Sequence, residues 1–136
     1  MNPWVLTFQQ QLDYSQHDEI TVEVGLVSET FSASVEAKLD TGSKFCIFQP
    51  SYARWLHLDL LSGIPERICT AAGSFPAYGH EVTLTVGDLE WQTTVYFAEP
   101  EDFPVNVVGR IGFLDHLRAG LVDYEQLLYF GPYETA

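Results

Sequence analysis

The residues best suited to chemistry form the run Asp40-Thr41-Gly42-Ser43, which combines a carboxylate with two hydroxyls and a glycine. The run follows residues 31–39, whose alternation of apolar and polar side chains predicts a half-buried strand. Asp is unfavourable inside a strand and Gly42 permits a sharp turn, so we expect the carboxylate on a tight loop. A carboxylate fixed in this way is suited to general acid–base chemistry. A plain strand-to-strand turn also explains the triplet, because Asp and Gly are both common turn residues.

Most of the elements that must position this loop are predicted to be strands. Alternating or apolar runs between turn signals mark them at residues 4–8, 20–24, 31–39, 45–48, 81–86, 89–97, 105–108 and 127–130. Residues 66–79 have strand-like ends around a centre of small residues, which predicts a further hairpin.

Two short helices and several connections complete the predicted elements. Pro50 and Ser51 are typical of the start of a helix, and apolar residues at helical spacing indicate a second helix over residues 111–119, with Gly120 as a stop. The polar residues 9–19, residues 25–30 and the acidic residues 99–104 are expected to link the strands. The sum is a mostly β protein, built as a small closed or folded-over barrel.

Length and composition predict one globular domain over residues 1–136. Apolar residues make up 46% of the chain and aromatic residues 14%, which is too much for a disordered protein. The net charge of −13 argues against nucleic acid and membrane partners, because phosphates and anionic lipids would be repelled. The chain has no long apolar span and begins without a basic signal-peptide region, so we expect a cytoplasmic protein.

Cysteines and histidines give no sign of a metal site. Cys46 and Cys69 both lie in apolar surroundings, which favours buried free thiols and leaves a disulfide as the alternative. No pair has the spacing of zinc ligands among the four histidines, His17, His57, His80 and His116. We therefore expect no metal and no cofactor.

Two further segments change the interpretation of the Asp-Thr-Gly-Ser run. The predicted hairpin has the small residues Ala71-Ala72-Gly73-Ser74 near its tip, and the apolar run Val107-Val108-Gly109-Arg110 precedes the second predicted helix. In this order and spacing, the three segments resemble the retropepsin-like aspartic proteases, the single-domain family that includes the retroviral proteases and their cellular relatives. The resemblance covers roughly residues 20–130.

The resemblance implies a role for each matching segment. Asp40 would be the catalytic carboxylate, the Thr41 hydroxyl would tie two active-site loops together across a dimer, and Gly42 would present backbone groups to substrate. Residues Ala71-Ala72-Gly73-Ser74 would form the tip of a flap that closes over a bound peptide. Residues Val107-Val108-Gly109-Arg110 would pack beneath and behind the catalytic loop. The implied fold is a small closed acid-protease-like barrel with a flap hairpin and one or two short helices.

The chemistry of peptide hydrolysis makes one demand on this arrangement. Two carboxylates must share a water, one ionised to take a proton from it and the other neutral to polarise the scissile carbonyl. Two carboxylates this close cannot both ionise easily, so the apparent pKa values of such a pair separate. This chain supplies one such motif. The resemblance therefore implies a homodimer that acts on a peptide or protein substrate, with one Asp40 from each subunit.

Ser43 is expected to tune the catalytic pair. A hydroxyl that donates to a catalytic carboxylate favours its charged form. Many retroviral members have alanine at this position, so we expect a more acidic activity optimum here than in an alanine-bearing relative.

Two positions depart from the retroviral pattern. Those members commonly carry Asp two residues after the glycine, where it pairs with the arginine of Gly-Arg, but this chain has Lys44. Arg110 then needs another partner, for which Asp115 and Asp123 are the candidates. Ile111-Gly112 stands where Asp or Asn usually follows Gly-Arg. These departures bear on dimer stability and on the substrate subsites.

Three functions from different classes are compatible with the sequence. The leading hypothesis is a homodimeric aspartic endopeptidase with Asp40 as its catalytic residue. A catalytically silent binding or assembly module that keeps the fold is the second, and Lys44 favours it. A small β-barrel unrelated to proteases, in which the run at Asp40 is only a turn, is the third.

Overall fold

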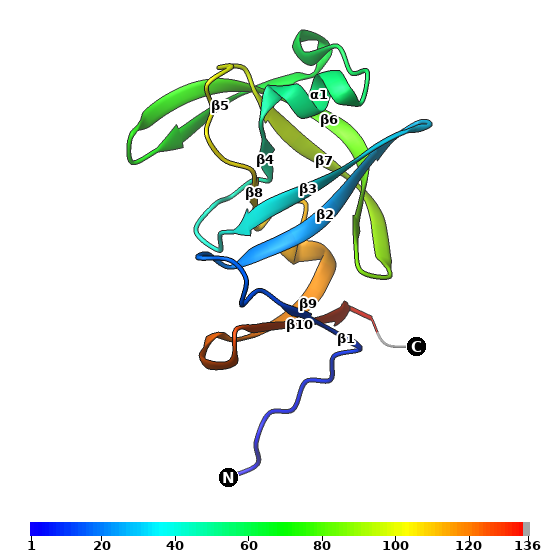
Figure 1. Ribbon diagram of the computed structural model, residues 1–136, viewed down its shortest axis with the longest axis vertical. Helices are drawn as coiled ribbons and strands as arrows, with labels where there is room; N and C mark the ends of the chain where they lie inside the picture. Colours follow the sequence, from blue (N-terminus) through cyan, green and yellow to red (C-terminus); the bar gives the residue numbers. More distant parts are fainter. Residues whose placement is uncertain (135–136) are drawn as a thin grey trace.

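Strands make up most of the computed structural model, which describes residues 1–134 (Figure 1). The strands are β1 (Gln10–Asp13), β2 (Thr21–Ser28), β3 (Phe31–Leu39), β4 (Ile47–Phe48), β5 (Ile64–Thr70), β6 (Gly73–Val86), β7 (Leu89–Ala98), β8 (Val107–Val108), β9 (Leu117–Val122) and β10 (Leu127–Pro132). The helical elements are α1 (Pro50–Trp55) and the 3₁₀ turns η1 (Leu60–Ser62), η2 (Leu114–His116) and η3 (Asp123–Glu125). The prediction of a mostly β protein is confirmed.

Six strands close into a barrel, as the sequence predicts. They pair in the order β2-β3-β8-β4-β7-β6, and a further pairing between β2 and β6 completes the ring. Gly25 allows the two strands to approach at this closure, because a Cβ atom there would collide with the hydroxyl of Thr85 on β6. β5 pairs with the first half of the long β6 and projects from the ring as a hairpin.

The barrel interior is filled by alternate side chains of its strands. Val22, Val24 and Leu26 of β2 are at most 1% exposed, while the residues between them face outward. Phe48 and Phe97 are fully buried in the same core. Burial of each such side chain contributes roughly 1.5–3 kcal/mol. The core thus fixes β3, β4 and β8, the strands that carry the residues around Asp40.

A second sheet, ordered β1-β10-β9, lies at the end of the molecule that holds both termini (Figure 1). The predicted strand at residues 4–8 is wrong. Residues 1–8 have no regular structure, and Trp4 is fully exposed. The strand forms instead at Gln10–Asp13, inside a stretch predicted to be a polar connection, because it pairs with β10 more than 110 residues away.

The predicted helix at residues 111–119 is also wrong. Only the 3₁₀ turn η2 forms, and β9 begins at Leu117, where the backbone is already extended. Gly112 has φ +106°, a conformation incompatible with a right-handed helix. Pairing of β9 with β10 then replaces the helical hydrogen bonds.

Two other boundaries differ from the prediction. The bend expected at residues 25–30 shortens to the turn between β2 and β3 at Glu29, which has φ +54°. β6 is a single strand from Gly73 to Val86, long enough to pair with β5 in the projecting hairpin and with β7 in the barrel. Within the described residues, no helix is long and apolar enough to cross a membrane.

Candidate active site

Asp40 lies directly after β3, on a loop that folds back onto its own carboxylate. Its backbone N–H donates to the carbonyl oxygen of Val108 at 3.0 Å, which extends the parallel pairing of β3 with β8. The Gly42 N–H donates to Asp40 Oδ1 at 2.9 Å, and the Ser43 N–H donates to the Asp40 carbonyl at 3.1 Å. Asp40 is only partly buried. Backbone contacts therefore hold its carboxylate in one orientation while leaving it open to solvent.

Residues 109–111 lie against the back of this loop. The N–H of Arg110 donates to the Ser43 carbonyl at 2.9 Å, and the N–H of Ile111 donates to the Lys44 carbonyl at 2.8 Å. A Cβ atom on Gly109 would lie 2.5 Å from the Phe45 carbonyl oxygen, closer than such atoms can approach. Glycine is thus required at position 109 for the two segments to come together.

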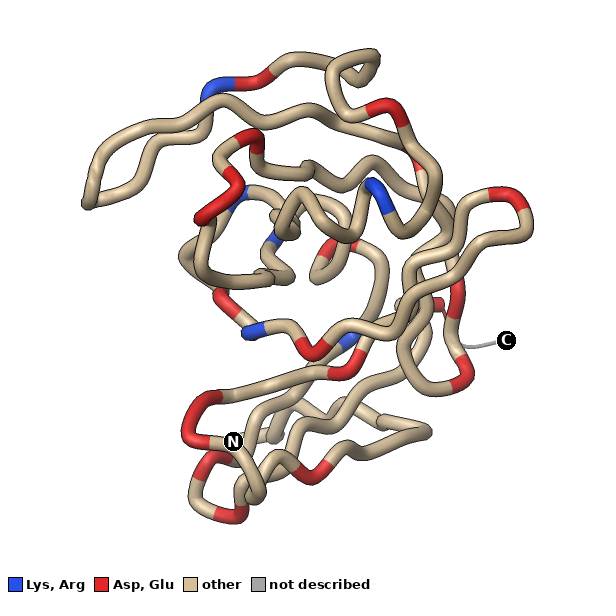
Figure 2. Tube along the Cα trace, turned by 45° about the horizontal axis from the view of Figure 1, so that its top comes forward, with Lys and Arg blue, Asp and Glu red and all other residues tan. Residues whose placement is uncertain are grey.

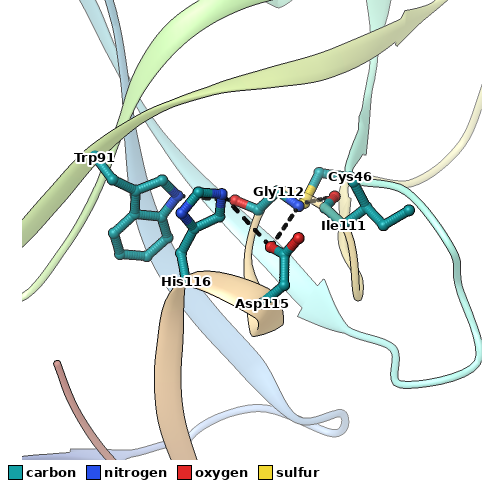
Figure 3. Close-up of polar contacts among 6 residues, drawn as sticks. All are labelled: Cys46, Trp91, Ile111, Gly112, Asp115 and His116. Carbon is teal, nitrogen blue, oxygen red and sulfur yellow. Dashed lines mark hydrogen bonds and ion pairs between the residues drawn. The ribbon is translucent and has the colours of Figure 1, made fainter. Parts of the chain in front are cut away.

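The peptide groups of Gly112 are held by two side chains (Figure 3). Its N–H donates to Asp115 Oδ1 at 2.9 Å, and its carbonyl accepts a hydrogen bond from Trp91 Nε1 at 2.9 Å. Gly112 is buried, so these partners satisfy backbone groups that water does not reach. Together they anchor the end of the segment that supports the Asp40 loop.

His116 and Cys46 complete the group around Gly112 (Figure 3). The imidazole stacks on Trp91 with the rings 5.4 Å apart and only 7° from parallel, and its Nε2 lies 3.5 Å from Asp115 Oδ1. The Cys46 Sγ lies 3.6 Å from the Ile111 carbonyl, and burial raises the pKa of this thiol to about 12. Cys46 is therefore a packed neutral thiol, as expected, whereas Cys69 is exposed, contrary to expectation.

A groove of about 670 Å³ joins the Asp40 loop to the hairpin of β5 and β6. The hairpin projects on the same side of the barrel as the loop between β3 and β4 (Figure 1). The groove is lined by Asp40, Gly42 and Ser43 of the Asp40 loop (residues 40–43) and by Lys44 and Phe45 directly after it. From the hairpin it is lined by Glu66, Arg67, Ile68, Cys69, Thr70, Ala71 and Phe75. Residues far apart in the sequence thus share one solvent-accessible space with the Asp40 carboxylate.

The tip of the hairpin is built from its own small residues. Thr70 Oγ1 donates to the Gly73 carbonyl at 3.1 Å and accepts from the Ala72 N–H at 3.2 Å. Gly73 has φ +132°, which favours glycine. Of the four predicted tip residues, Ala71 lines the groove, while Ala72, Gly73 and Ser74 are exposed around the turn.

A small apolar cluster joins the hairpin to the barrel. Ile68 of β5 is 7% exposed and packs with the buried Ile47, Ala77 and Ala98. Phe45, directly after the Asp40 loop, also packs against this cluster. The hairpin and the loop therefore share one apolar base, which fixes their spacing.

Contrary to the prediction, the Ser43 hydroxyl does not donate a hydrogen bond to Asp40. It donates instead to the carbonyl oxygen of Phe45 at 2.8 Å. The hydroxyl has a single proton to donate, so in this conformation it stabilises the loop and donates no hydrogen bond to the Asp40 carboxylate. Thr41 is exposed.

The proposed replacement partners of Arg110 are occupied elsewhere. Asp115 binds the Gly112 N–H, and Asp123 accepts a hydrogen bond from the hydroxyl of Tyr14. Arg110 is exposed. Lys44, the other departure from the retroviral pattern, places its Nζ 5.2 Å from the centre of the Phe45 ring.

The buried part of the predicted site is the strand before Arg110. Val108 is fully buried and Val107 is 7% exposed, and Val107 also lines the groove. The sequence marked Gly112 only as a departure from the retroviral pattern, and it did not single out Trp91 as part of this region. Among residues 1–134, no group of three or more His, Cys, Asp or Glu side chains is arranged to hold a metal.

Comparison with known proteins identifies the fold. No protein-family model and no curated protein sequence matches the chain. Among solved structures, it is similar to a retropepsin-like aspartic protease from Rickettsia conorii, with a TM-score of 0.65 and 14% identity over 89% of this chain and 98% of that one. It is also similar to EIAV protease in complex with the inhibitor HBY-793, with a TM-score of 0.56 and 20% identity over 73% of this chain and 88% of that one. The chain has a retropepsin-like fold.

Proposed function

We propose that this chain is one subunit of a homodimeric aspartic endopeptidase, and that residues 1–136 form a single protease domain. The observation that carries the proposal is the position of Asp40, which is held by backbone hydrogen bonds beside a groove formed with a projecting hairpin. A retropepsin-like fold around that groove supports the same function.

The reaction needs a second carboxylate, which another copy of the chain supplies. A water held between the two Asp40 side chains attacks the carbonyl carbon of the scissile bond. The ionised carboxylate takes a proton from the water while the neutral one donates a hydrogen bond to the carbonyl oxygen. Collapse of the tetrahedral intermediate breaks the C–N bond, with the proton passing to the leaving amine. A monomer lacks one of the two groups and is inactive.

The residues around Asp40 have supporting roles in this proposal. Gly42 keeps the loop narrow, since a Cβ atom there would lie 3.2 Å from Asp40 Oδ1. The exposed Thr41 hydroxyl is free to reach the other subunit. Ala71-Ala72-Gly73-Ser74 close over the peptide as the tip of the flap. Val107-Val108-Gly109-Arg110 hold the catalytic loop from behind.

A catalytically silent binding module is the second candidate. It is favoured by the lysine at position 44, directly after the Asp40 loop, and by an Arg110 that neither Asp115 nor Asp123 pairs with. Such a module would keep the groove and bind peptides without cleaving them.

Cleavage of a denatured protein at acidic and neutral pH separates the two candidates. We expect cleavage that pepstatin, an inhibitor of aspartic proteases, blocks and that Asp40→Asn abolishes. Asp88→Asn in the exposed turn between β6 and β7 is the matched control and should leave the rate unchanged. Cleavage that survives Asp40→Asn contradicts the proposed catalytic residue. A dimer that binds peptides but never cleaves them favours the silent module.

A further inference from the structure

The groove is the place where the few positive charges of this protein gather. The whole chain has 19 acidic residues and only six lysines and arginines. Three of these six, Lys38, Lys44 and Arg67, line the groove, compared with two of the acidic residues, Asp40 and Glu66. Figure 2 shows acidic positions spread over the chain trace and few basic ones. The charge balance in the groove is thus opposite to that of the molecule.

Two of these cations are available to a ligand. Among the ion pairs within residues 1–134, neither Lys44 nor Arg67 takes part. Arg67 uses its Nε to donate to Ser74 Oγ at 3.1 Å, which leaves the other N–H groups of the guanidinium free. Lys44 rests over the Phe45 ring and keeps its charge exposed.

Lys38 is only loosely occupied. Its Nζ lies 3.6 Å from the Glu19 carboxylate, and both side chains are largely exposed, at 43% and 61%. An ion pair of this kind is weak in water, so a carboxylate of a ligand can compete for it.

The acidic loop beside the groove contributes no acidic residue to the groove lining. Within residues 99–104, Glu101 makes a two-pronged ion pair with Arg54 at 2.7 and 3.0 Å. Arg54 belongs to α1, outside the groove lining. The loop enters the groove with the apolar ring of Phe103 instead.

Apolar residues also line the groove. They come from the segment after the Asp40 loop, from the hairpin and from the connection between β7 and β8: Phe45, Ile47, Ile68, Phe75, Phe103 and Val105. A ligand that matches this surface has an apolar segment with negative charge beside it.

We propose that the groove selects extended peptides that carry Asp or Glu side chains next to apolar residues. The proposal rests on the proposed function for the site, and names its substrate class. Lys44 follows the Asp40 loop and Arg67 belongs to the hairpin, so the positive charge at the groove comes from two different elements. The selection is local, because the net charge of −13 repels an acidic peptide at long range.

The test uses three peptides with one apolar core and flanking Glu, Gln or Lys residues. Their kcat/KM values are measured with the wild-type protein. Their Kd values are measured with the Asp40→Asn variant, so that the binding measurement does not depend on cleavage. We expect kcat/KM to be highest and Kd lowest for the Glu peptide, followed by the Gln peptide and then the Lys peptide. Adding Lys44→Gln and Arg67→Gln to each background should reduce the Glu-over-Gln preference by roughly fivefold or more.

Arg118→Gln is the matched control, because it removes one positive charge from β9 on the other sheet. It should leave the preference unchanged. Equal Kd values for the three peptides, no binding of any of them, or a preference that survives the double substitution would each overturn the proposal. Binding with the expected order but without cleavage supports the groove preference and contradicts the endopeptidase. Cleavage without the order contradicts only the preference.

Discussion

At the scale of single residues, Asp40 is fixed by its neighbours' backbones. Gly42 and Val108 each make one hydrogen bond to it, and Gly109 lets the supporting strand approach from behind. Backbone groups are already positioned by the fold, so they orient a carboxylate without ordering a further side chain. Substitution of Ser43 tests this description of the loop, and chemical modification of the two cysteines tests the packing around it.

Ser43→Ala is expected to lower the free energy of unfolding and to leave the pH dependence of peptide cleavage nearly unchanged. The substitution removes the hydrogen bond to the Phe45 carbonyl, which costs about 0.5–1.5 kcal/mol of the free energy of unfolding. Urea denaturation measures that loss, and a pH–rate profile on a peptide substrate supplies the second readout. An upward shift of the profile would show that the hydroxyl turns toward Asp40 in the assembled enzyme, contrary to its position in the single chain.

The two cysteines are expected to differ sharply in reactivity. Burial raises the pKa of Cys46 to about 12, so almost none of it is the reactive thiolate at mildly alkaline pH. Cys69 is exposed and lines the groove. A thiol reagent should therefore modify one cysteine in the native protein and both after denaturation.

Mass spectrometry of the modified protein identifies the site, and Cys69→Ser is the control that should abolish the native reaction. A bulky group on Cys69 should also lower peptide binding, since it fills the groove. Rapid modification of Cys46 in the native protein would contradict the described packing.

At the scale of elements, β7 supports the Asp40 loop through Gly112. Trp91 of β7 donates to the Gly112 carbonyl, and Asp115 of η2 accepts from its N–H. This places a strand, a 3₁₀ turn and the segment after β8 in one connected unit. Disturbing the unit should therefore affect the conformation of the Asp40 loop.

Trp91→Phe tests this connection. It keeps an aromatic ring but removes the N–H donor, so the buried Gly112 carbonyl loses its partner at a cost of about 1–3 kcal/mol. Trp55→Phe is the matched control, because Trp55 makes a similar 2.9 Å bond to the Ser32 carbonyl while remaining 68% exposed. Urea denaturation should show the larger loss of stability for Trp91→Phe. Equal losses would contradict the structural role given to the Gly112 contacts.

The elements that the sequence predicts well are those coded by local patterns. β3 and β7 alternate clearly, and the hairpin of β5 and β6 has small residues at its turn. The Asp40 run could be recognised for the same reason, since its turn chemistry is contained in a few neighbouring residues.

The wrong predictions concern elements decided by distant partners. β1 has no strong pattern of its own and exists because β10 pairs with it. Residues 111, 114 and 117, which lead into β9, are apolar and at helical spacing, yet the pairing of β9 with β10 prevails. The Trp91 contact to Gly112 likewise joins residues 21 positions apart, with no sequence motif to mark it. Long-range pairing is what the sequence alone could not supply.

At the scale of the whole molecule, charge opposes the proposed dimer. Each copy has a net charge of −13, so two copies repel one another at low ionic strength. Raising the salt concentration from about 0.01 M to about 0.15 M shortens the screening length from about 30 Å to about 8 Å.

The dimer should therefore become tighter over this range of salt. Sedimentation velocity at several protein concentrations measures the dissociation constant, which is expected to fall. Arg118→Gln makes each copy more negative and should weaken the dimer most at low salt. A dimer that weakens as salt rises would indicate an interface held by opposite charges instead.

The central claim is that two Asp40 carboxylates, one from each subunit, form the active site. Mixing wild-type protein with Asp40→Asn in varying proportion, under conditions that let subunits exchange, tests it most directly. If both carboxylates are required, peptide cleavage follows the square of the wild-type fraction, so an equal mixture retains about one quarter of the activity. A linear fall to about one half, in which each wild-type subunit works regardless of its partner, would contradict the claim.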